Sequence, residues 1–218
     1  MKEPKIITID GPAGAGKSTV AKEIAKRFGY VHLDSGALYR AIGYFCKLKG
    51  VNLTKKEEVL GAIKNINVEL LPNGRVLLNG KDVTKEIRTP EGGVLASQVA
   101  QFPEVREFVV KLLREMAVGK KIVIDGRDAG TYIFPEADLK IYLTAFPEER
   151  ARRRYKELKE KGFNVTFEEV LKEVIERDKK DESREFAPLK VPEGAVIVDT
   201  TGKSLEEVLK TISNLINN

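Results

Sequence analysis

Residues 6–19 read IITIDGPAGAGKST, an apolar run followed by a glycine-rich segment. The segment contains the pattern GxxxxGK[ST] as Gly11, Gly16, Lys17 and Ser18. An apolar strand is predicted at 5–9 and a helix at about 17–28, ending before Gly29. This strand–loop–helix setting is the context that a phosphate-binding loop requires. The sequence therefore predicts a site for the phosphates of a nucleoside triphosphate.

Each part of this loop has a task in phosphate binding. Glycines let backbone N–H groups wrap around a phosphate, and the following helix offers further N–H groups at its N-terminus. Lys17 supplies a mobile positive charge for the β- and γ-phosphates, and Ser18 supplies a hydroxyl to Mg²⁺. We expect the triphosphate to be held by Gly11, Pro12, Ala13, Gly14, Ala15, Gly16, Lys17, Ser18 and Thr19.

The composition is typical of a soluble globular protein. No apolar run approaches the roughly 20 residues of a membrane span, so we expect no membrane partner. The net charge of +5 is modest and both signs are mixed along the chain, which favours a polyanionic small substrate over nucleic acid. Cys46 is the single cysteine; it excludes an intrachain disulfide and favours a reducing, cytoplasmic location.

Predicted strands and helices alternate along the 218 residues. Further strands are expected at 30–33, 122–124, 139–143 and 195–198, and helices at 36–49, 103–117, 147–161, 166–182 and 204–216. This alternation predicts an α/β fold with a five-stranded parallel sheet flanked by helices. We expect one domain over residues 1–218, with ligands at the C-terminal ends of the strands.

One segment interrupts the alternation. Residues 66–83 predict a small hairpin, with a turn at Pro72-Asn73-Gly74 between apolar stretches. Asn-Gly between such stretches is a strong turn signal. We interpret the region of about 62–86 as an insertion that packs over one side of the site.

Polar residues follow two other predicted strands. Asp34-Ser35-Gly36 follows the second strand, with Arg40 one helical turn beyond, and Asp125-Gly126-Arg127-Asp128 follows the third. Asp125 is placed to orient Mg²⁺, directly or through water, and Arg127 and Asp128 are candidates for a second ligand. An ordinary polar strand end is the alternative, but three such ends converge on one edge of the sheet.

Two sets of arginines lie on predicted helices. Arg177, Asp181 and Arg184 are spaced i, i+4, i+7 and share one face if the helix continues that far. A solvated face with a weak ion pair is one interpretation, and a site for a phosphate beside a sugar hydroxyl is the other. The helix after the fourth strand carries Arg150, Arg152, Arg153 and Arg154, and such a run is more often a solvated face, or a sign of nucleic-acid binding. Arg150 and Arg154 share a face at i, i+4, where arginines can stabilise a migrating phosphoryl group.

Five motifs together resemble the nucleoside monophosphate kinase family, and within it the bacterial-type cytidylate kinases. They are ITIDGPAGAGKST, LDSGALYR, ASQVAQFPEVRE, IDGRDAGTYIFPEADLKIYL and ERDKKDESREFAPL, in the expected order over nearly the whole chain. The resemblance implies a P-loop kinase fold, with the hairpin in a monophosphate-binding insertion and a short lid at about 150–165. It also implies a monomer that transfers phosphate from ATP to CMP or dCMP with Mg²⁺.

The resemblance further implies a role for each matching residue. Around the CMP site it places Ser35, Arg40 and Arg127, with the two arginines on the phosphate. To the cytosine edge it assigns Ser97, Arg106 and Asp128. To the phosphates and pentose hydroxyls it assigns Arg177, Asp181 and Arg184. Arg150 and Arg154 would belong to the lid over ATP, with Lys17, Arg127, Arg177 and Arg154 acting in catalysis.

Two other functions fit parts of the sequence. A P-loop kinase of another small molecule, such as UMP, another nucleotide or shikimate, would share the phosphate loop. A P-loop protein that switches a partner or binds nucleic acid would need a motif such as NKxD or a stronger basic stripe, which the sequence lacks.

Overall fold

A computed structural model describes residues 3–72 and 74–217. The described residues of 1–30 and 121–218 form one compact unit, here named the P-loop unit, and those of 31–120 form another, the middle unit. In the described residues, no helix combines the length and the apolar composition needed to cross a membrane. The division of the chain into one domain with an insertion at 62–86 stays a prediction.

The main sheet has five strands in the order β2-β6-β1-β7-β8. Their bounds are β1 (Ile6–Asp10), β2 (Val31–Asp34), β6 (Ile122–Gly126), β7 (Leu139–Thr144) and β8 (Val196–Asp199). β1 pairs in parallel with both β6 and β7, and β7 pairs in parallel with β8. The predicted α/β class, with a five-stranded parallel sheet flanked by helices, is confirmed.

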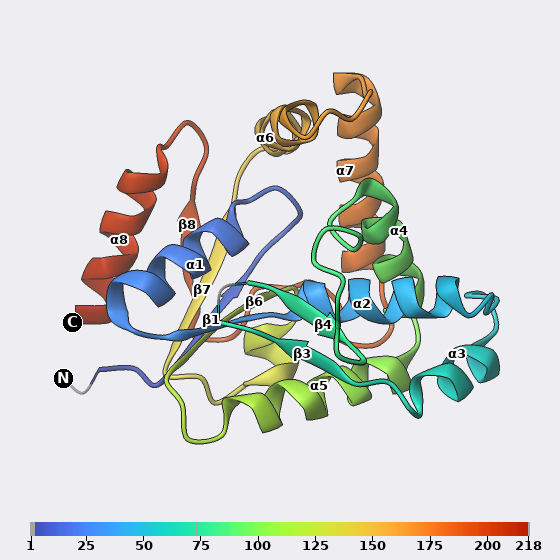
Figure 1. The fold of residues 1–218 in the computed structure, drawn as a ribbon. Helices are drawn as coiled ribbons and strands as arrows, with labels where there is room; N and C mark the ends of the chain where they lie inside the picture. Colours follow the sequence, from blue (N-terminus) through green and yellow to red (C-terminus); the bar gives the residue numbers. More distant parts are fainter. Residues whose placement is uncertain (1–2, 73, 218) are drawn as a thin grey trace. The chain divides into compact units, whose positions relative to one another are not determined.

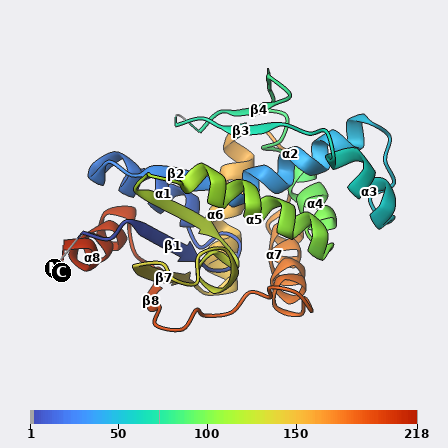
Figure 2. The same ribbon diagram turned by 90° about the horizontal axis from the view of Figure 1, so that it is seen from below.

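One face of this sheet is covered by α1 (Lys17–Phe28) and α8 (Leu205–Asn217), as Figure 1 and Figure 2 show. Side chains alternate between the faces of a strand, so Ile7 and Ile9 point to the same side. Both are completely buried in a cluster with apolar residues of the two helices, such as Ile24 and Ile212. This core fixes the end of β1, from which the phosphate loop starts.

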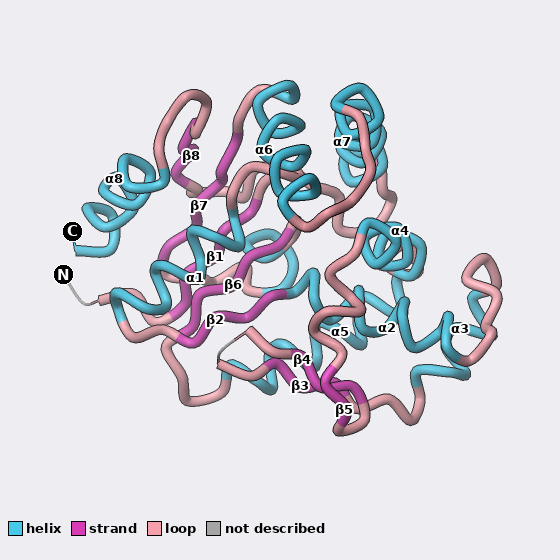
Figure 3. The backbone as a smooth tube through the Cα atoms, turned by 45° about the horizontal axis from the view of Figure 1, so that its top comes forward, coloured by secondary structure: helices cyan, strands magenta, loops and turns pink. Residues whose placement is uncertain are grey.

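Two further helices of the P-loop unit, α6 (Pro147–Glu160) and α7 (Phe167–Glu182), pack side by side (Figure 3). A small cluster of buried apolar residues joins them: Ala151, Leu158, Val170 and Val174. Thr166 caps α7 through a reciprocal pair of hydrogen bonds with Glu169. The lid expected at about 150–165 covers most of α6 and its connection to α7, and its motion stays a prediction.

The middle unit combines helices with a three-stranded antiparallel sheet. Its helices are α2 (Ser35–Leu48), α3 (Lys56–Ile63), α4 (Pro90–Val99) and α5 (Pro103–Ala117). The small sheet has the order β3-β4-β5, from β3 (Val68–Leu70), β4 (Val76–Leu78) and β5 (Lys81–Asp82). The predicted hairpin is confirmed and extended by β5, although Asn73 of its predicted turn lies outside the described residues.

α3 and α4 were not predicted from the sequence. α4 contains Gly92 and Gly93, which weaken helix propensity, and Thr89 caps it by accepting a hydrogen bond from the Gly92 N–H. Packing explains why the helix forms. A methyl group at Gly43 of α2 would lie 2.8 Å from the Leu95 backbone, so the glycine permits α2 and α4 to approach closely.

Candidate active site

The phosphate loop runs from Gly11 at the end of β1 to the start of α1. Gly11 and Gly14 have positive φ angles of 146° and 77°, a conformation that favours glycine. A methyl group at Gly11 would also lie 2.0 Å from the carbonyl oxygen of Leu143, and one at Gly14 would lie 2.8 Å from that of Arg150. Gly11 and Gly14 therefore have a steric reason as well as a conformational one, whereas Gly16 has a positive φ of 92° and open space around it.

Two buried cations donate to carbonyl groups of this loop. The Lys17 ammonium donates to the Pro12 carbonyl at 2.7 Å, and the Arg150 guanidinium donates to the Ala13 carbonyl at 2.9 Å. Both contacts engage acceptor groups of the backbone. They are compatible with the use of backbone N–H groups of the loop for a phosphate.

Arg150 is only 3% exposed. It donates to the Ala145 carbonyl at 2.9 Å and to both carboxylate oxygens of Asp178, at 3.1 and 2.6 Å. This fork is the strong, directional form of ion pair. In this structure the expected lid residue Arg150 is thus an internal support of the phosphate loop. Asp178, in the charge run RDKKD, was not singled out from the sequence.

The Ser18 hydroxyl donates to a carboxylate oxygen of Asp125 at 2.6 Å. Hydroxyl and carboxylate oxygens are ligands that Mg²⁺ accepts. Among residues 3–72 and 74–217, no cluster of three or more His, Cys, Asp or Glu side chains could hold a metal. The oxygens of Ser18 and Asp125 are the candidate protein ligands for such an ion.

Positive charges gather beside the loop. Burial lowers the pKa of Lys17 well below its usual value, and the charges of Arg127 and Arg177 lower it further, whereas Asp125 and Asp181 oppose the shift. A buried ammonium under the influence of two guanidinium groups is stabilised by an anion. The carboxylates of Asp125 and Asp181 balance part of the positive charge around Lys17.

Asp181 joins two of the predicted arginines. It accepts from Arg127 Nε at 2.9 Å and from Arg184 Nη2 at 3.0 Å. Burial alone would raise the pKa of Asp181, but Arg127, Arg184 and Arg177 hold it below its usual value. α7 ends at Glu182, so Arg184 lies just beyond the helix and still contacts Asp181.

The last candidates of the P-loop unit are Arg154 and Asp128. Arg154 is half-buried on α6 and pairs with Glu157 at 3.3 Å. Asp128 is buried directly before a short π-helix, η1 (Ala129–Ile133). Its carbonyl accepts from the N–H groups of Tyr132 and Ile133. Single π-turns of this kind are frequent at functional sites.

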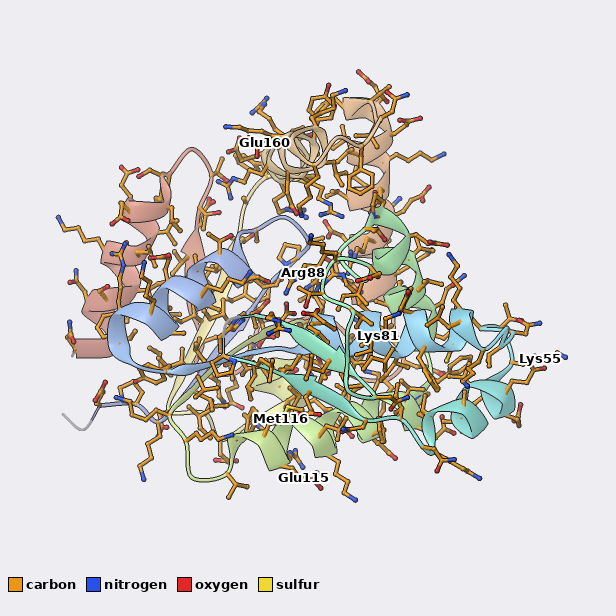
Figure 4. All side chains as sticks on the ribbon, in the orientation of Figure 1. Lys55, Lys81, Arg88, Glu115, Met116 and Glu160 are labelled. Atoms are coloured by element: carbon orange, nitrogen blue, oxygen red, sulfur yellow. The ribbon has the colours of Figure 1, made fainter. Side chains whose placement is uncertain are left out.

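The other predicted residues belong to the middle unit. Ser35 is buried at the start of α2, which Asp34 caps by accepting from the Ala37 N–H at 2.9 Å. Arg40 lies one helical turn later and is half-buried. The same cap residue is contacted by Arg88, labelled in Figure 4, which donates to it at 3.5 Å. Arg88 was not singled out from the sequence.

Ser97 and Arg106 lie on neighbouring elements of this unit. Ser97 is half-buried on α4. Arg106 is 1% exposed on α5, donates to the Ala100 carbonyl at 3.4 Å, and lies 5.6 Å from the centre of the Tyr39 ring. A guanidinium this deeply buried is costly unless it is hydrogen-bonded, and the Ala100 carbonyl supplies one acceptor.

Comparison with known proteins gives consistent matches over the length of the chain. The profile of a family described as cytidylate kinase matches residues 7–218. The cytidylate kinase of Thermotoga neapolitana is 49% identical over 211 residues, covering 96% of each chain. That of Clostridioides difficile is 44% identical over 212 residues, covering 97% of this chain and 98% of the relative.

A solved structure shows the same fold at low identity. An uncharacterized protein from Eubacterium ventriosum matches with a TM-score of 0.55 and 13% identity, covering 98% of both chains. At this identity the likeness concerns the fold alone.

Proposed function

The chain belongs to the cytidylate kinase family, and on this premise we propose that it transfers the γ-phosphate of ATP to CMP or dCMP. The products are ADP and CDP or dCDP. The match over residues 7–218 carries the proposal. The cationic surroundings of Lys17 support it, because they suit phosphate groups.

ATP occupies the phosphate loop in this proposal. The backbone N–H groups of Gly11–Thr19 surround its phosphates, and Lys17 leaves the Pro12 carbonyl to contact the migrating group. Ser18 and Asp125 hold Mg²⁺, which neutralises charge on the triphosphate when bound. The 2.6 Å contact between their oxygens supports this assignment.

The monophosphate occupies a second subsite. Arg40 and Arg127 bind its phosphate beside Ser35, and Arg177, Asp181 and Arg184 reach phosphates and pentose hydroxyls. The contacts of Asp181 with Arg127 and Arg184 support the last assignment, since they hold the carboxylate ionised as an acceptor for hydroxyl groups.

Ser97, Arg106 and Asp128 read the base. Cytosine presents an amino donor with two acceptors, so a carboxylate or hydroxyl accepts from it and an arginine donates to it. Uracil reverses the polarity at two positions, which would set the acceptor oxygens of Asp128 against a carbonyl oxygen. Hydrogen-bonding sites reject such analogues strongly because buried groups remain unpaired.

The transfer needs no general base, because a phosphate dianion is itself a nucleophile. The CMP phosphate oxygen attacks the γ-phosphorus in line, and the enzyme contributes positioning and charge neutralisation through Lys17, Arg127, Arg177 and Arg154. Arg154 acts from the lid at about 150–165, which closes to exclude water. We assign Arg150 to support of the phosphate loop, on the basis of its contact with Ala13.

We further propose a monomer in the cytoplasm, without nucleic-acid or membrane partners. A single cysteine and the mixed charge pattern support this location.

The test is ADP release from ATP and Mg²⁺ with a panel of acceptors: CMP, dCMP, UMP, AMP, GMP and shikimate. We expect CMP and dCMP to give the highest kcat/KM. Faster turnover with UMP, another nucleotide or shikimate would favour the alternative of a kinase for that molecule. Absence of stimulation by CMP would contradict the proposal.

A further inference from the structure

Asp10 ends β1 directly before the phosphate loop, on the face of the strand opposite Ile7 and Ile9. It is 0% exposed, as is Thr8 on the same face. A buried carboxylate is costly unless hydrogen bonds compensate for lost water. The hydrogen-bond partners of Asp10 therefore show how its burial is compensated.

Both oxygens of the Asp10 carboxylate accept from the same short segment. Oδ1 accepts from the Ala129 N–H and Oδ2 from the Gly130 N–H, each at 2.7 Å. These residues begin η1 and lie 119 and 120 positions away in the chain. Each oxygen of the side chain is thus held by one short hydrogen bond from the backbone of η1.

Gly130 makes this approach sterically possible. A methyl group there would lie 2.7 Å from Thr8 Oγ1 and 3.2 Å from the Asp10 carboxylate. The backbone of residues 129–130 thus packs directly against the end of β1, and the carboxylate fixes its position along the strand and its distance from it.

The anchored segment carries two of the residues assigned to the acceptor. Arg127 and Asp128 immediately precede Ala129, and Arg127 reaches Asp181 at 2.9 Å. Asp10 is also the residue before Gly11, where the triphosphate loop starts. One side chain therefore connects the two halves of the predicted site.

We propose that Asp10 is a positioning residue that holds the loop carrying Arg127 and Asp128 in register with the phosphate loop, so that the acceptor phosphate lines up with ATP. This inference rests on the proposed function for its kinetic consequence. Asp10 acts through the backbone of residues 129–130 and does not touch the substrate.

The test compares Asp10→Asn with a matched control, Asp138→Asn, whose side chain contacts the backbone at the start of β1. Asp138 Oδ2 also accepts two backbone N–H groups, from Lys5 at 2.9 Å and Ile6 at 2.8 Å. Asp10→Asn preserves the size of the side chain but replaces one acceptor oxygen by an NH₂ group. A donor then faces one of the two backbone N–H donors, and that hydrogen bond is lost. Asp138→Asn alters a carboxylate that precedes β7 and accepts from N–H groups at the start of β1, away from residues 127–133.

For Asp10→Asn we expect kcat/KM for CMP to fall on the order of 10²-fold, the cost of a displacement of about 1 Å. Affinity for ADP without CMP should change less than about threefold, because the phosphate loop keeps its own supports. Asp138→Asn should leave all these constants within about twofold. An equal loss of ADP affinity and CMP turnover in Asp10→Asn would overturn the proposal, as would unchanged CMP kinetics.

Amide hydrogen exchange in residues 127–133 gives a readout independent of the substrate. We expect faster exchange in Asp10→Asn and unchanged exchange in Asp138→Asn, and equal exchange in wild type and Asp10→Asn would overturn the anchoring. If wild type does not phosphorylate CMP, the proposed function fails while this measurement still tests the anchor. If Asp10→Asn does not fold, Gly130→Ala replaces it in the test. We then expect faster exchange in residues 127–133 and a lower kcat/KM for CMP in Gly130→Ala, and wild-type values of both would overturn the proposal.

Discussion

The loops after β1 and β6 lie at adjacent strand ends but are held by opposite kinds of contact. Arg150 and Lys17 donate to carbonyl groups of the first loop, whereas Asp10 accepts from N–H groups of the second. The first loop is proposed to bind phosphate with its N–H groups, so supports at its carbonyls leave those donors available. The second is proposed to bind with the side chains of Arg127 and Asp128, so its N–H groups can serve as anchors.

This difference makes separate predictions for the two loops. A variant that disturbs the loop after β1 should change the kinetic constants for ATP. A variant that disturbs the loop after β6 should change those for CMP. If variants in either loop changed the kinetic constants for ATP and for CMP equally, the two loops would not have separate functions.

Lys17→Ala should have the largest effect, because it removes the side chain that we propose contacts the migrating phosphoryl group. We expect turnover with CMP to fall on the order of 10³-fold, with an unchanged circular dichroism spectrum. Lys22→Ala, at an exposed position of the same helix, is the control and should be near normal. A folded Lys17→Ala enzyme with ordinary turnover would refute the proposed chemistry.

Asp128→Ala tests the side-chain function of the second loop. The ratio of kcat/KM for CMP to that for UMP should fall by roughly 10²-fold, because the variant no longer sets a carboxylate against the uracil O4. KM for ATP should stay near the wild-type value. An unaltered CMP-to-UMP ratio would count against Asp128 as a reader of the base.

Asp178→Asn tests the support of the first loop through Arg150. We expect KM for ATP to rise about tenfold while KM for CMP changes little, because the Ala13 carbonyl loses its fixed donor. Urea unfolding should show a loss of roughly 3 kcal/mol, since Arg150 is buried and loses its counter-charge.

The matched control for Asp178→Asn is Glu176→Gln on the same helix. Glu176 pairs with Lys172 at 4.0 Å, and both side chains are largely exposed, so the loss should stay below about 1 kcal/mol. A rise in KM for CMP as large as that for ATP in Asp178→Asn would mean that the two loops are not independent.

Much of the fold could be predicted because its signals are local. α1 and α5 have the predicted bounds, and the five strands of the main sheet lie within one or two residues of theirs. Apolar runs predict strands, and glycines after helices predict helix ends, without knowledge of any distant contact. α4 was missed because its glycines signal a poor helix, whereas contacts such as that between Gly43 and Leu95 depend on tertiary packing.

The supports of the site were missed for a related reason. Asp178 is 28 residues from Arg150, and Asp10 is 119 residues from Ala129. In the sequence Asp178 belongs to a charge run and Asp10 to a strand end, and neither position reveals its partner. A carboxylate at the end of an otherwise apolar strand, next to a phosphate loop, is the signal that could have directed attention to Asp10.

The pH dependence of stability gives the smallest expected effect and tests how the amides hold Asp10. Burial raises the pKa of Asp10 from 3.8 to about 7, and the hydrogen bonds from Gly130 and Ala129 oppose the rise. Between these pH values the folded protein binds a proton that the unfolded chain has released. The contribution of Asp10 to stability therefore falls as pH rises from about 4 to 7, by at most about 1.4 kcal/mol per pH unit.

Asp10→Asn cannot titrate at this position, so the difference in unfolding free energy between wild type and variant should shrink from pH 5 to pH 7. Urea unfolding at both pH values measures it. A constant difference for Asp10→Asn would mean that the two N–H groups keep the carboxylate ionised over the whole range. The second loop would then be held by a full negative charge at every pH tested, in contrast to the guanidinium of Arg150 that holds the first.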